Sequence, residues 1–268
     1  MKIEDVKVFG FEPALHGMRN PMDSWHDSDT TYYDIGGEEF LPLFNGELAR
    51  IPERPLIGPK DLKLACKLIR RGSEHRKFMR EIMVWMNITI PRYVWQELDT
   101  YKVATVRNSC STMNKLGSKD LEQSDFQHPI PAAQLDNINM LGRILREAKG
   151  EGEGVREARV QLKNDLCEGF LQKATYMMSY ETVLAVILQR EKHRLPEWRI
   201  QSEGSITQTL MALPYMTQFY KAATFKRDQL RSAISDLDRM IEQITQGGGA
   251  ILPVEDLKDL KAKLKRAA

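Results

Sequence analysis

The chain has 268 residues, 42% of them hydrophobic, so it is long enough to bury a sizeable core as one large domain or as one domain with an appendage. Acidic and basic residues nearly cancel, and a formal net charge of +2 gives no reason to expect a nucleic-acid partner. The three cysteines stand far apart without a Cys-x-x-Cys pair, which argues against a disulfide scaffold or a zinc ribbon and indicates a reducing compartment.

The first residues, MKIEDVKVFG, lack the pattern of a signal peptide. No apolar run approaches the ~18 residues of a membrane span. We therefore expect a soluble, cytoplasmic protein without membrane contact.

The N-terminal part of the chain is predicted to hold one strand, a polar loop region and one helix. Residues 3–11 alternate between apolar and polar side chains, as a strand does. Turn-forming residues then recur over 16–40, which predicts loops with little regular structure. Apolar residues at helical spacing predict a helix over 58–72, which Gly72 is expected to end.

The middle of the chain is predicted to form a strand, a short helix and a polar stretch. Alternate residues of 77–90 are apolar, which predicts a strand closed by Pro91. Residues 92–102 have a helical pattern. The overlapping stretch 99–116 lacks an apolar stripe and collects hydroxyls, amides and cations, which marks it as a candidate binding site.

The C-terminal half is predicted to be mostly helical. Two helices separated by the glycine-rich KGEGEG are expected between 130 and 166, and the broad apolar stripe of 175–198 predicts a long helix that Pro196 stops. Beyond 225, apolar residues recur at spacings of four and three until glycines 247–249 interrupt them, which predicts a helical hairpin.

The predicted fold class is therefore α+β, with a small, mostly antiparallel sheet flanked by long helices and an added C-terminal helical hairpin. We expect one domain over residues 1–220 and the hairpin over residues 221–268.

Motifs of common enzyme classes are absent from the sequence. It has no phosphate-binding P-loop, no dinucleotide-binding glycine motif, no His-Glu-x-x-His and no Gly-x-Ser-x-Gly. The five histidines are never three or four residues apart, so no metal site is predicted. Cys110 lies among hydroxyls, where it is either a nucleophile or a small filler; without an identified base the second interpretation is favoured.

The order of residues from 72 to 113 is more informative. A serine is followed by Glu74 and His75, then by the strand, by a helix that Arg92 opens, and by the polar stretch. This order resembles the core of the flavin-dependent thymidylate synthases, in which a Glu-His pair, a strand and an Arg-led helix precede the motif Arg-His-Arg-x-x-Ser-x-Asn-Glu-x-Ser-x-Arg.

Counting from Arg92 places this motif on the polar stretch. The Arg-His-Arg triplet falls on Thr100, Tyr101 and Lys102, and the first serine on Thr105. The Asn-Glu pair falls on Arg107 and Asn108, the second serine on Cys110, and the last arginine on Thr112, or on Ser111 if the register shifts by one residue.

A second block supports the resemblance. The family has a basic residue before Leu-Pro, an Asn that opens a long helix, and an Arg eleven residues after this Asn. The corresponding residues are Lys163, Ser179 and Arg190, and no gap is needed between them. The chain is most similar to the diverged relatives that phages often carry.

The resemblance implies a homo-oligomer, expected to be a tetramer, that methylates or hydroxymethylates a pyrimidine deoxynucleotide such as dUMP. Reduced FAD would supply hydride, methylene-tetrahydrofolate the carbon, and NADPH the reducing equivalents. Arg190 would polarise the pyrimidine ring as the catalytic residue. Implied substrate contacts are Lys102, Thr105, Cys110, Ser111 and Lys163; implied flavin contacts are His75, Thr100, Tyr101, Lys102, Asn108 and Ser179.

The chain also departs from the family. Where the family has three cations for phosphates, only Lys102 remains. A charged hydrogen bond contributes roughly 1.5–3 kcal/mol, so two uncompensated losses would weaken binding by about 10²- to 10⁴-fold. Arg107 and Arg19 are the candidate replacements.

Simpler interpretations remain open for single residues. Arg190 could pair with solvent and the last carbonyls of its helix, His75 could be a surface residue, and Lys163 could solvate a helix face. For the whole chain, the alternative is a non-catalytic oligomeric protein that keeps the synthase fold and uses its hairpin for assembly. Nucleic-acid binding by the basic end KDLKAKLKRAA is disfavoured by the balanced net charge.

Overall fold

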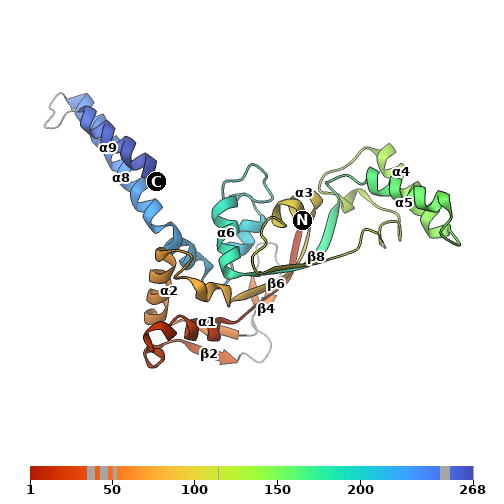
Figure 1. Ribbon diagram of the computed structural model, residues 1–268. Coiled ribbons are helices and arrows are strands. Elements are labelled where there is room, and N and C mark those ends of the chain that lie inside the picture. Colours follow the sequence, from red (N-terminus) through yellow and green to blue (C-terminus); the bar gives the residue numbers. More distant parts are fainter. Residues whose placement is uncertain (35–39, 43–47, 51–52, 114, 248–253, 268) are drawn as a thin grey trace.

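A four-stranded antiparallel sheet lies at the centre of the molecule, with its strands in the order β1-β6-β8-β7 (Figure 1). The computed structural model describes residues 1–34, 40–42, 48–50, 53–113, 115–247 and 254–267. The strands are β1 (Lys2–Phe9), β6 (Met83–Pro91), β7 (Thr105–Ser109) and β8 (Leu171–Ser179). Helices flank this small sheet, which confirms the predicted α+β class.

Strand β6 forms the middle of the sheet because it pairs with β1 on one side and with β8 on the other. Its side chains alternate as the sequence predicted, with Val84, Met86, Ile88 and Ile90 buried and the residues between them half-buried. The buried side chains join those of α3 (Arg92–Leu98) and α6 (Tyr180–Arg190) in the main hydrophobic core.

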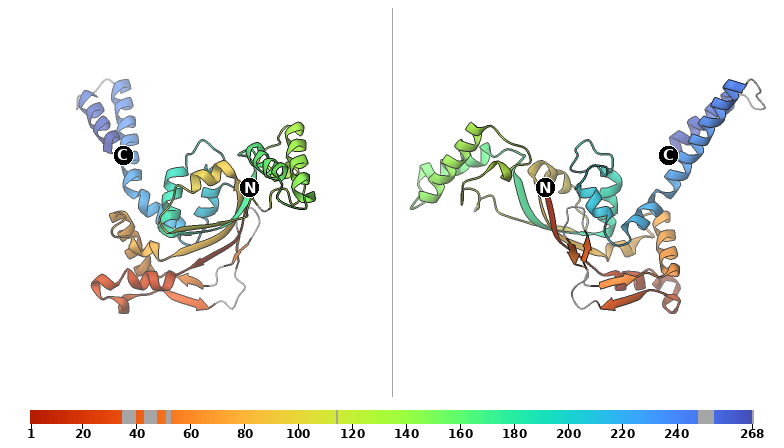
Figure 2. Two further views of the ribbon diagram at one scale, coloured as in Figure 1. Left: turned by 45° about the vertical axis from the view of Figure 1, so that its right-hand side comes forward. Right: turned by 180° about the vertical axis from the view of Figure 1, so that it is seen from behind.

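Two pairs of helices project from opposite ends of the sheet (Figures 1 and 2). The first pair, predicted on either side of the glycine-rich interruption, is α4 (Ala132–Glu147) with α5 (Glu153–Asp165), and it has a small core of its own. The second pair is the predicted hairpin, α8 (Met216–Gly247) with α9 (Val254–Ala267). Gly247 ends α8, while Gly248 and Gly249 lie outside the described residues.

Helix α8 runs without interruption through the predicted boundary between residues 220 and 221. Over residues 216–243, the part of the helix whose burial is described, the buried residues are confined to the first nine positions: Met216, Phe219, Ala222 and Thr224. The later apolar residues Leu230, Ile234 and Leu237 are only half-buried. The division into two domains stays a prediction.

The remaining α-helices and β-strands of the described residues complete the fold. They are α1 (Phe11–Gly17), α2 (Pro59–Arg71), α7 (Ile206–Met211), the pair β2 (Thr31–Asp34) and β5 (Glu53–Leu56), and the pair β3 (Phe40–Pro42) and β4 (Leu48–Arg50). Among the helices of the described ranges, none is both long enough and apolar enough to cross a membrane.

The predicted strand over 77–90 begins too early. Residues Lys77–Arg80 form a 3-10 helix, and β6 starts only at Met83. The neighbouring residues Phe78 and Met79 are both buried, unlike the alternate residues of β6, which has one buried face.

The predicted helix over 175–198 is wrong at both ends. Its first five residues belong to β8, and α6 begins after Ser179, whose Oγ accepts a hydrogen bond from the Thr182 N–H at 3.2 Å. This N-cap separates the strand from the helix, although the apolar residues continue across it. The helix ends at Arg190, six residues before Pro196.

The polar regions contain more regular structure than the sequence predicted. The stretch 99–116 holds β7, an edge strand that pairs with β8 through its backbone and so needs few apolar side chains, and α3 ends at Leu98 instead of 102. The predicted loop region 16–40 holds the end of α1 and the strand β2; its residues 35–39 lie outside the described part.

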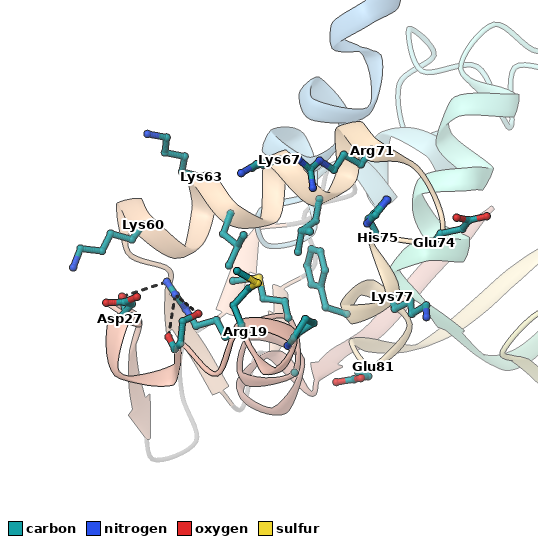
Figure 3. Close-up of a pocket in the computed structure, with 18 residues that line it drawn as sticks. Arg19, Asp27, Lys60, Lys63, Lys67, Arg71, Glu74, His75, Lys77 and Glu81 are labelled. Carbon is teal, nitrogen blue, oxygen red and sulfur yellow. Dashed lines mark hydrogen bonds between the residues drawn. The ribbon is translucent and has the colours of Figure 1, made fainter.

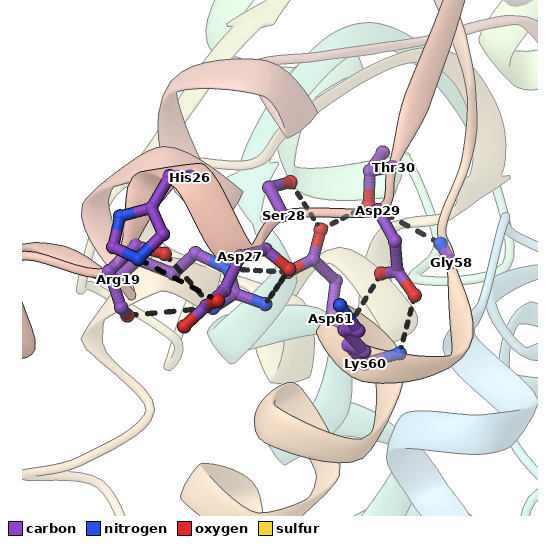
Figure 4. Close-up of polar contacts among 10 residues, drawn as sticks. Arg19, His26, Asp27, Ser28, Asp29, Thr30, Gly58, Lys60 and Asp61 are labelled. Atoms are coloured by element: carbon purple, nitrogen blue, oxygen red, sulfur yellow. Dashed lines mark hydrogen bonds and ion pairs between the residues drawn. The ribbon is translucent and has the colours of Figure 1, made fainter.

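A buried ion pair attaches the loop over residues 19–30 to α2 (Figure 4). The Arg19 Nε donates to Asp61 Oδ1 at 2.6 Å, and both side chains are almost fully buried. Asp61 Oδ2 accepts from the hydroxyls of Ser28 at 2.6 Å and Thr30 at 2.5 Å. All the oxygens of this carboxylate are therefore hydrogen-bonded, as a buried charge requires.

The same loop caps α2. Gly58 precedes the helix and has no side chain with which to cap it, so Asp29 accepts from the N–H groups of Lys60 at 2.9 Å and Asp61 at 3.1 Å. A Cβ at Gly58 would lie 2.3 Å from the Asp29 carboxylate carbon, which explains why glycine stands there.

Asp61→Ala is expected to lower the free energy of unfolding by about 3–5 kcal/mol at neutral pH, because it leaves the Arg19 guanidinium buried and unpaired. Urea unfolding of the two proteins measures this difference. Asp136→Ala removes an exposed carboxylate of α4 and serves as the control, with an expected change within about 0.5 kcal/mol.

The pH dependence provides a second check of the same variant. Burial raises the pKa of the Asp61 carboxyl group, but hydrogen bonds from Ser28, Thr30 and Arg19 outweigh it and hold the pKa below the ordinary 3.8. The stabilisation is therefore complete above about pH 4 and is lost as the pH falls through the folded-state pKa. A stability difference that stays constant in acid would contradict this assignment.

Candidate functional site

The predicted site residues lie in three separate places of one chain. The first, the α3–α6 junction, holds Thr100, Tyr101, Lys102, Thr105, Ser179 and Arg190. The second, the β7 exit, holds Asn108, Cys110, Ser111 and Lys163. The third is the α2 groove, a cavity between α2 and the loop after α1 that includes His75.

Arg190 is the centre of the α3–α6 junction. Its Nε donates to the Tyr101 hydroxyl at 3.2 Å, and its Nη1 donates to Glu97 Oε2 at 3.0 Å. The same Nη1 lies 2.9 Å from His193 Nε2. In the described part of the chain no group accepts from Nη2, so a guanidinium with five N–H donors keeps one nitrogen for a ligand.

Aromatic rings lie against the Arg190 guanidinium. Its central carbon is 5.3 Å from the ring centroid of Trp198 and 5.9 Å from that of Tyr101. Trp198 is fully buried, whereas the Arg190 side chain keeps 18% of its surface exposed. The cation is thus oriented by packing and by Glu97, and it remains in contact with solvent.

The other predicted residues of this junction mainly hold the backbone in place. The Thr105 hydroxyl donates to the Tyr101 carbonyl at 2.7 Å, and the Thr100 hydroxyl donates to the Glu97 carbonyl at 2.7 Å. Ser179 is buried and caps α6. Lys102 is exposed and has no carboxylate partner within the described residues.

Arg107 and Arg19, the candidate replacements for the family's phosphate-binding cations, are both engaged in contacts within the chain. Arg107 pairs with Asp99 at 2.5 Å, donates to Gln172 at 2.8 Å and stacks 4.2 Å above the Trp95 ring. Arg19 is committed to Asp61. Both arginines therefore have structural partners that satisfy their charge.

The β7 exit contains a half-buried cation. The Lys163 Nζ donates to the Thr112 hydroxyl, and no carboxylate of the described chain pairs with it. Burial lowers the pKa of Lys163, and the nearby Arg92 guanidinium lowers it further. An anion placed here would relieve both effects.

A cavity of about 240 Å³ adjoins this cation, with Cys110, Ser111 and Thr112 in its wall. Cys110 is exposed, and its backbone N–H donates to the Lys173 carbonyl at 2.8 Å. Asn108 is exposed on β7 opposite Thr175 of β8. In the described ranges there is no group of three or more His, Cys, Asp or Glu side chains that could hold a metal ion.

The α2 groove is the feature that the sequence analysis missed (Figure 3). It is a cavity of about 920 Å³ lined by six basic side chains besides Arg19, namely Lys60, Lys63, Lys67, Arg71, His75 and Lys77. The available signal was the spacing of three, four and four residues between the cations of α2, which places them along one side of the helix.

Glu97 and Arg190 are expected to stabilise the protein jointly by about 1 kcal/mol, because their side chains are only partly buried. A double-mutant cycle with Glu97→Gln and Arg190→Gln, followed by urea unfolding, measures this coupling. The same cycle with the exposed Arg194 in place of Arg190 is the control and should give no coupling. A coupling of zero for the first pair would show that the ion pair does not stabilise the fold.

Comparison with known proteins identifies the fold. No family model and no curated protein matches the sequence. The flavin-dependent thymidylate synthase ThyX from Helicobacter pylori, in a crystal structure complexed with FAD and dUMP, matches with a TM-score of 0.56 and 14% identity over 83% of this chain and 99% of that chain. A second structure of the Helicobacter pylori enzyme with FAD and dUMP has a TM-score of 0.55 at the same identity and coverage. The chain therefore has the fold of these thymidylate synthases.

Proposed function

We propose that the chain is a diverged, phage-type relative of the flavin-dependent thymidylate synthases that methylates or hydroxymethylates a pyrimidine deoxynucleotide such as dUMP. The observation that carries the proposal is the contact between Tyr101 and Arg190. These residues are 89 positions apart in the sequence, both were selected from the family motifs, and their side chains meet in the structure.

Arg190 has the chemistry that such a reaction needs. Attack from C5 of a pyrimidine ring becomes easier when a cation is held against N3 and the neighbouring carbonyl, because it stabilises the charge that develops on them. Glu97 and Tyr101 orient the guanidinium before the substrate binds, and Nη2 keeps its donors for the ring. The solvent contact of Arg190 leaves a path by which a nucleotide can reach it.

Lys163 is our candidate for the nucleotide phosphate. It lies beside Arg92, which opens α3, whereas Glu97 and Tyr101 lie at the other end of this helix. The two cation sites thus flank a helix of seven residues, which extends about 10 Å. We propose a homo-oligomer, expected to be a tetramer, in which neighbouring subunits complete this site.

FAD does not fit the residues that replace the family's cation triplet. Thr100 and Tyr101 are neutral, Lys102 is the remaining charge, and Arg107 is committed to Asp99. A flavin dinucleotide carries a diphosphate that charged hydrogen bonds would have to hold. FAD, with methylene-tetrahydrofolate and NADPH as co-substrates, thus requires cations from another part of the chain.

dUMP at 100 times its dissociation constant is expected to stabilise the purified full-length protein by about 2.7 kcal/mol, because the ligand binds only the folded state. For a domain of this size the melting temperature should rise by roughly 5–10 °C. Arg190→Gln should abolish the shift, whereas Arg194→Gln, which removes an exposed cation four residues further on, should retain it. A visible flavin absorbance band after incubation with FAD is the accompanying readout.

The enzyme proposal would be wrong if the protein took up no flavin and no pyrimidine nucleotide at millimolar concentration shifted its melting temperature. A shift that Arg190→Gln leaves unchanged would place the nucleotide elsewhere.

A second candidate function is a non-catalytic oligomeric protein with the synthase fold. The observation in its favour is the hairpin, in which Leu230, Ile234 and Leu237 form a seam on α8 that α9 leaves half-buried. Such a seam resembles the apolar stripe of a coiled coil whose further helices come from another subunit.

This second function predicts that removal of residues 225–268 reduces the mass of the oligomer in light scattering. The hydrophobic core should survive the truncation, because over residues 216–243 the buried residues of α8 end at Thr224; the polar contacts that the truncation removes include the one from Arg227 to Glu191 at 3.0 Å. An unchanged oligomer with an unchanged circular dichroism spectrum would exclude the assembly role of the hairpin.

A further inference from the structure

The α2 groove combines a row of cations with an apolar floor. Helix α2 forms one wall, the loop after α1 forms the second, and the 3-10 turn Lys77–Arg80 closes one end (Figure 3). Its volume of about 920 Å³ lies in the range of small-molecule sites. Of the site residues that the family motifs suggested, His75 is the one that lies here.

Apart from Arg19, the cations that line the groove have no anionic partner among the described residues. Lys60, Lys63, Lys67, Arg71 and Lys77 have exposed side chains, and no carboxylate of the described residues is within ion-pair distance of them. The molecule as a whole is almost neutral, so this concentration of positive charge is local.

This arrangement is unfavourable for α2 on its own. Lys63, Lys67 and Arg71 repeat every four residues, a spacing at which like charges repel each other across one turn. Lys60 lies in the first turn, where the helix dipole disfavours a cation, and the acid of that turn, Asp61, is already neutralised by Arg19. A bound polyanion would remove these unfavourable terms.

The rest of the groove favours a ligand with an apolar ring over a polymer of phosphates alone. Met18, Leu64, Leu68 and Phe78 form an apolar surface in its wall. Asp27, Glu74 and Glu81 also line it and would repel phosphates placed next to them. In Figure 3, Glu74 and Glu81 lie toward the turn, away from Lys60 and Lys63.

We propose that the α2 groove binds a nucleotide that carries two or more phosphates. The phosphates lie on Lys63, Lys67 and Arg71, and the ring system lies over the apolar surface beside Phe78. A base or sugar at the acidic end donates hydrogen bonds to Glu81, which lies at the end of the groove away from Lys60 (Figure 3). FAD and NADPH belong to this chemical class.

The site does not depend on the proposed function. ADP carries a diphosphate but neither a flavin nor a pyrimidine, so it probes the groove without engaging the reaction at Arg190. If the protein binds ADP in the groove but does not bind dUMP, the nucleotide site is supported and the methylation proposal is contradicted. If it binds dUMP but not ADP, the methylation proposal is supported and the nucleotide site is contradicted.

Isothermal titration of the full-length protein with ADP at low salt tests the proposal. ADP should bind, adenosine should bind at least about 10-fold more weakly because it lacks the charged contacts, and salt should weaken ADP binding. The double variant K63E/K67E should reduce ADP affinity by about 10-fold or more. Both positions are exposed, so the fold should be retained, which the melting temperature checks.

The control variant K149E/R156E makes the same change in net charge on the projecting α4–α5 pair, where both residues are exposed, and should leave ADP affinity unchanged. An equal loss of ADP affinity in the two variants would show that net charge alone causes the effect, and it would overturn the proposal that ADP binds in the groove. Absence of ADP binding at millimolar concentration, or unchanged affinity in K63E/K67E, would also overturn it. Binding of an oligothymidylate of about 15 nucleotides that ADP does not displace would assign the groove to nucleic acid instead.

Discussion

The buried ion pair between Arg19 and Asp61 is the interaction on which the wall of the α2 groove depends. It fixes a loop of polar and turn-forming residues, which has little apolar surface to bury, against the first turn of α2. The same contact neutralises the acid of that turn, so Lys63 and Lys67 line the groove with no carboxylate of the described residues at ion-pair distance. One pair thus shapes the cavity and leaves it electropositive.

The sequence was informative where one physical signal decided the structure. Alternation along β6 and helical spacing along α2 located these elements, because a buried face imposes its period on the residues. The signal failed where tertiary contacts decided. The apolar run across Ser179 continues from a strand into a helix, and a serine hydroxyl that caps α6 marks the boundary. Strand β7 is held by backbone pairing with β8, so its polar side chains concealed it.

The candidate site was predictable only where the sequence carried a motif. Motif order brought Tyr101 and Arg190 to attention, and the structure places them in contact. The cations of α2 belong to no motif, and their spacing alone does not separate a solvated helix face from a binding surface. The structure separates these two alternatives because it places the loop over residues 19–30, which is far from α2 in sequence, opposite the cations as the second wall of a cavity. Such a cavity has no local sequence signal.

Burial and hydrogen-bond partners together separate the arginines that hold the fold from the arginine that can serve a ligand. Arg19 and Asp61 are both almost fully buried, so releasing this guanidinium would leave a desolvated charge. Arg107 is as exposed as Arg190, but Asp99 and Gln172 occupy both of its terminal nitrogens and its guanidinium stacks on Trp95. The pair between Glu97 and Arg190 retains 31% and 18% exposure, and water can replace either partner. An ion pair of this kind contributes little stability, so it can orient Arg190 and still yield to a ligand that makes better contacts. The partial exposure of this pair, together with an Nη2 that donates to no described residue, therefore makes Arg190 suitable as a binding group, whereas burial confines Arg19 to structure and its two partners confine Arg107.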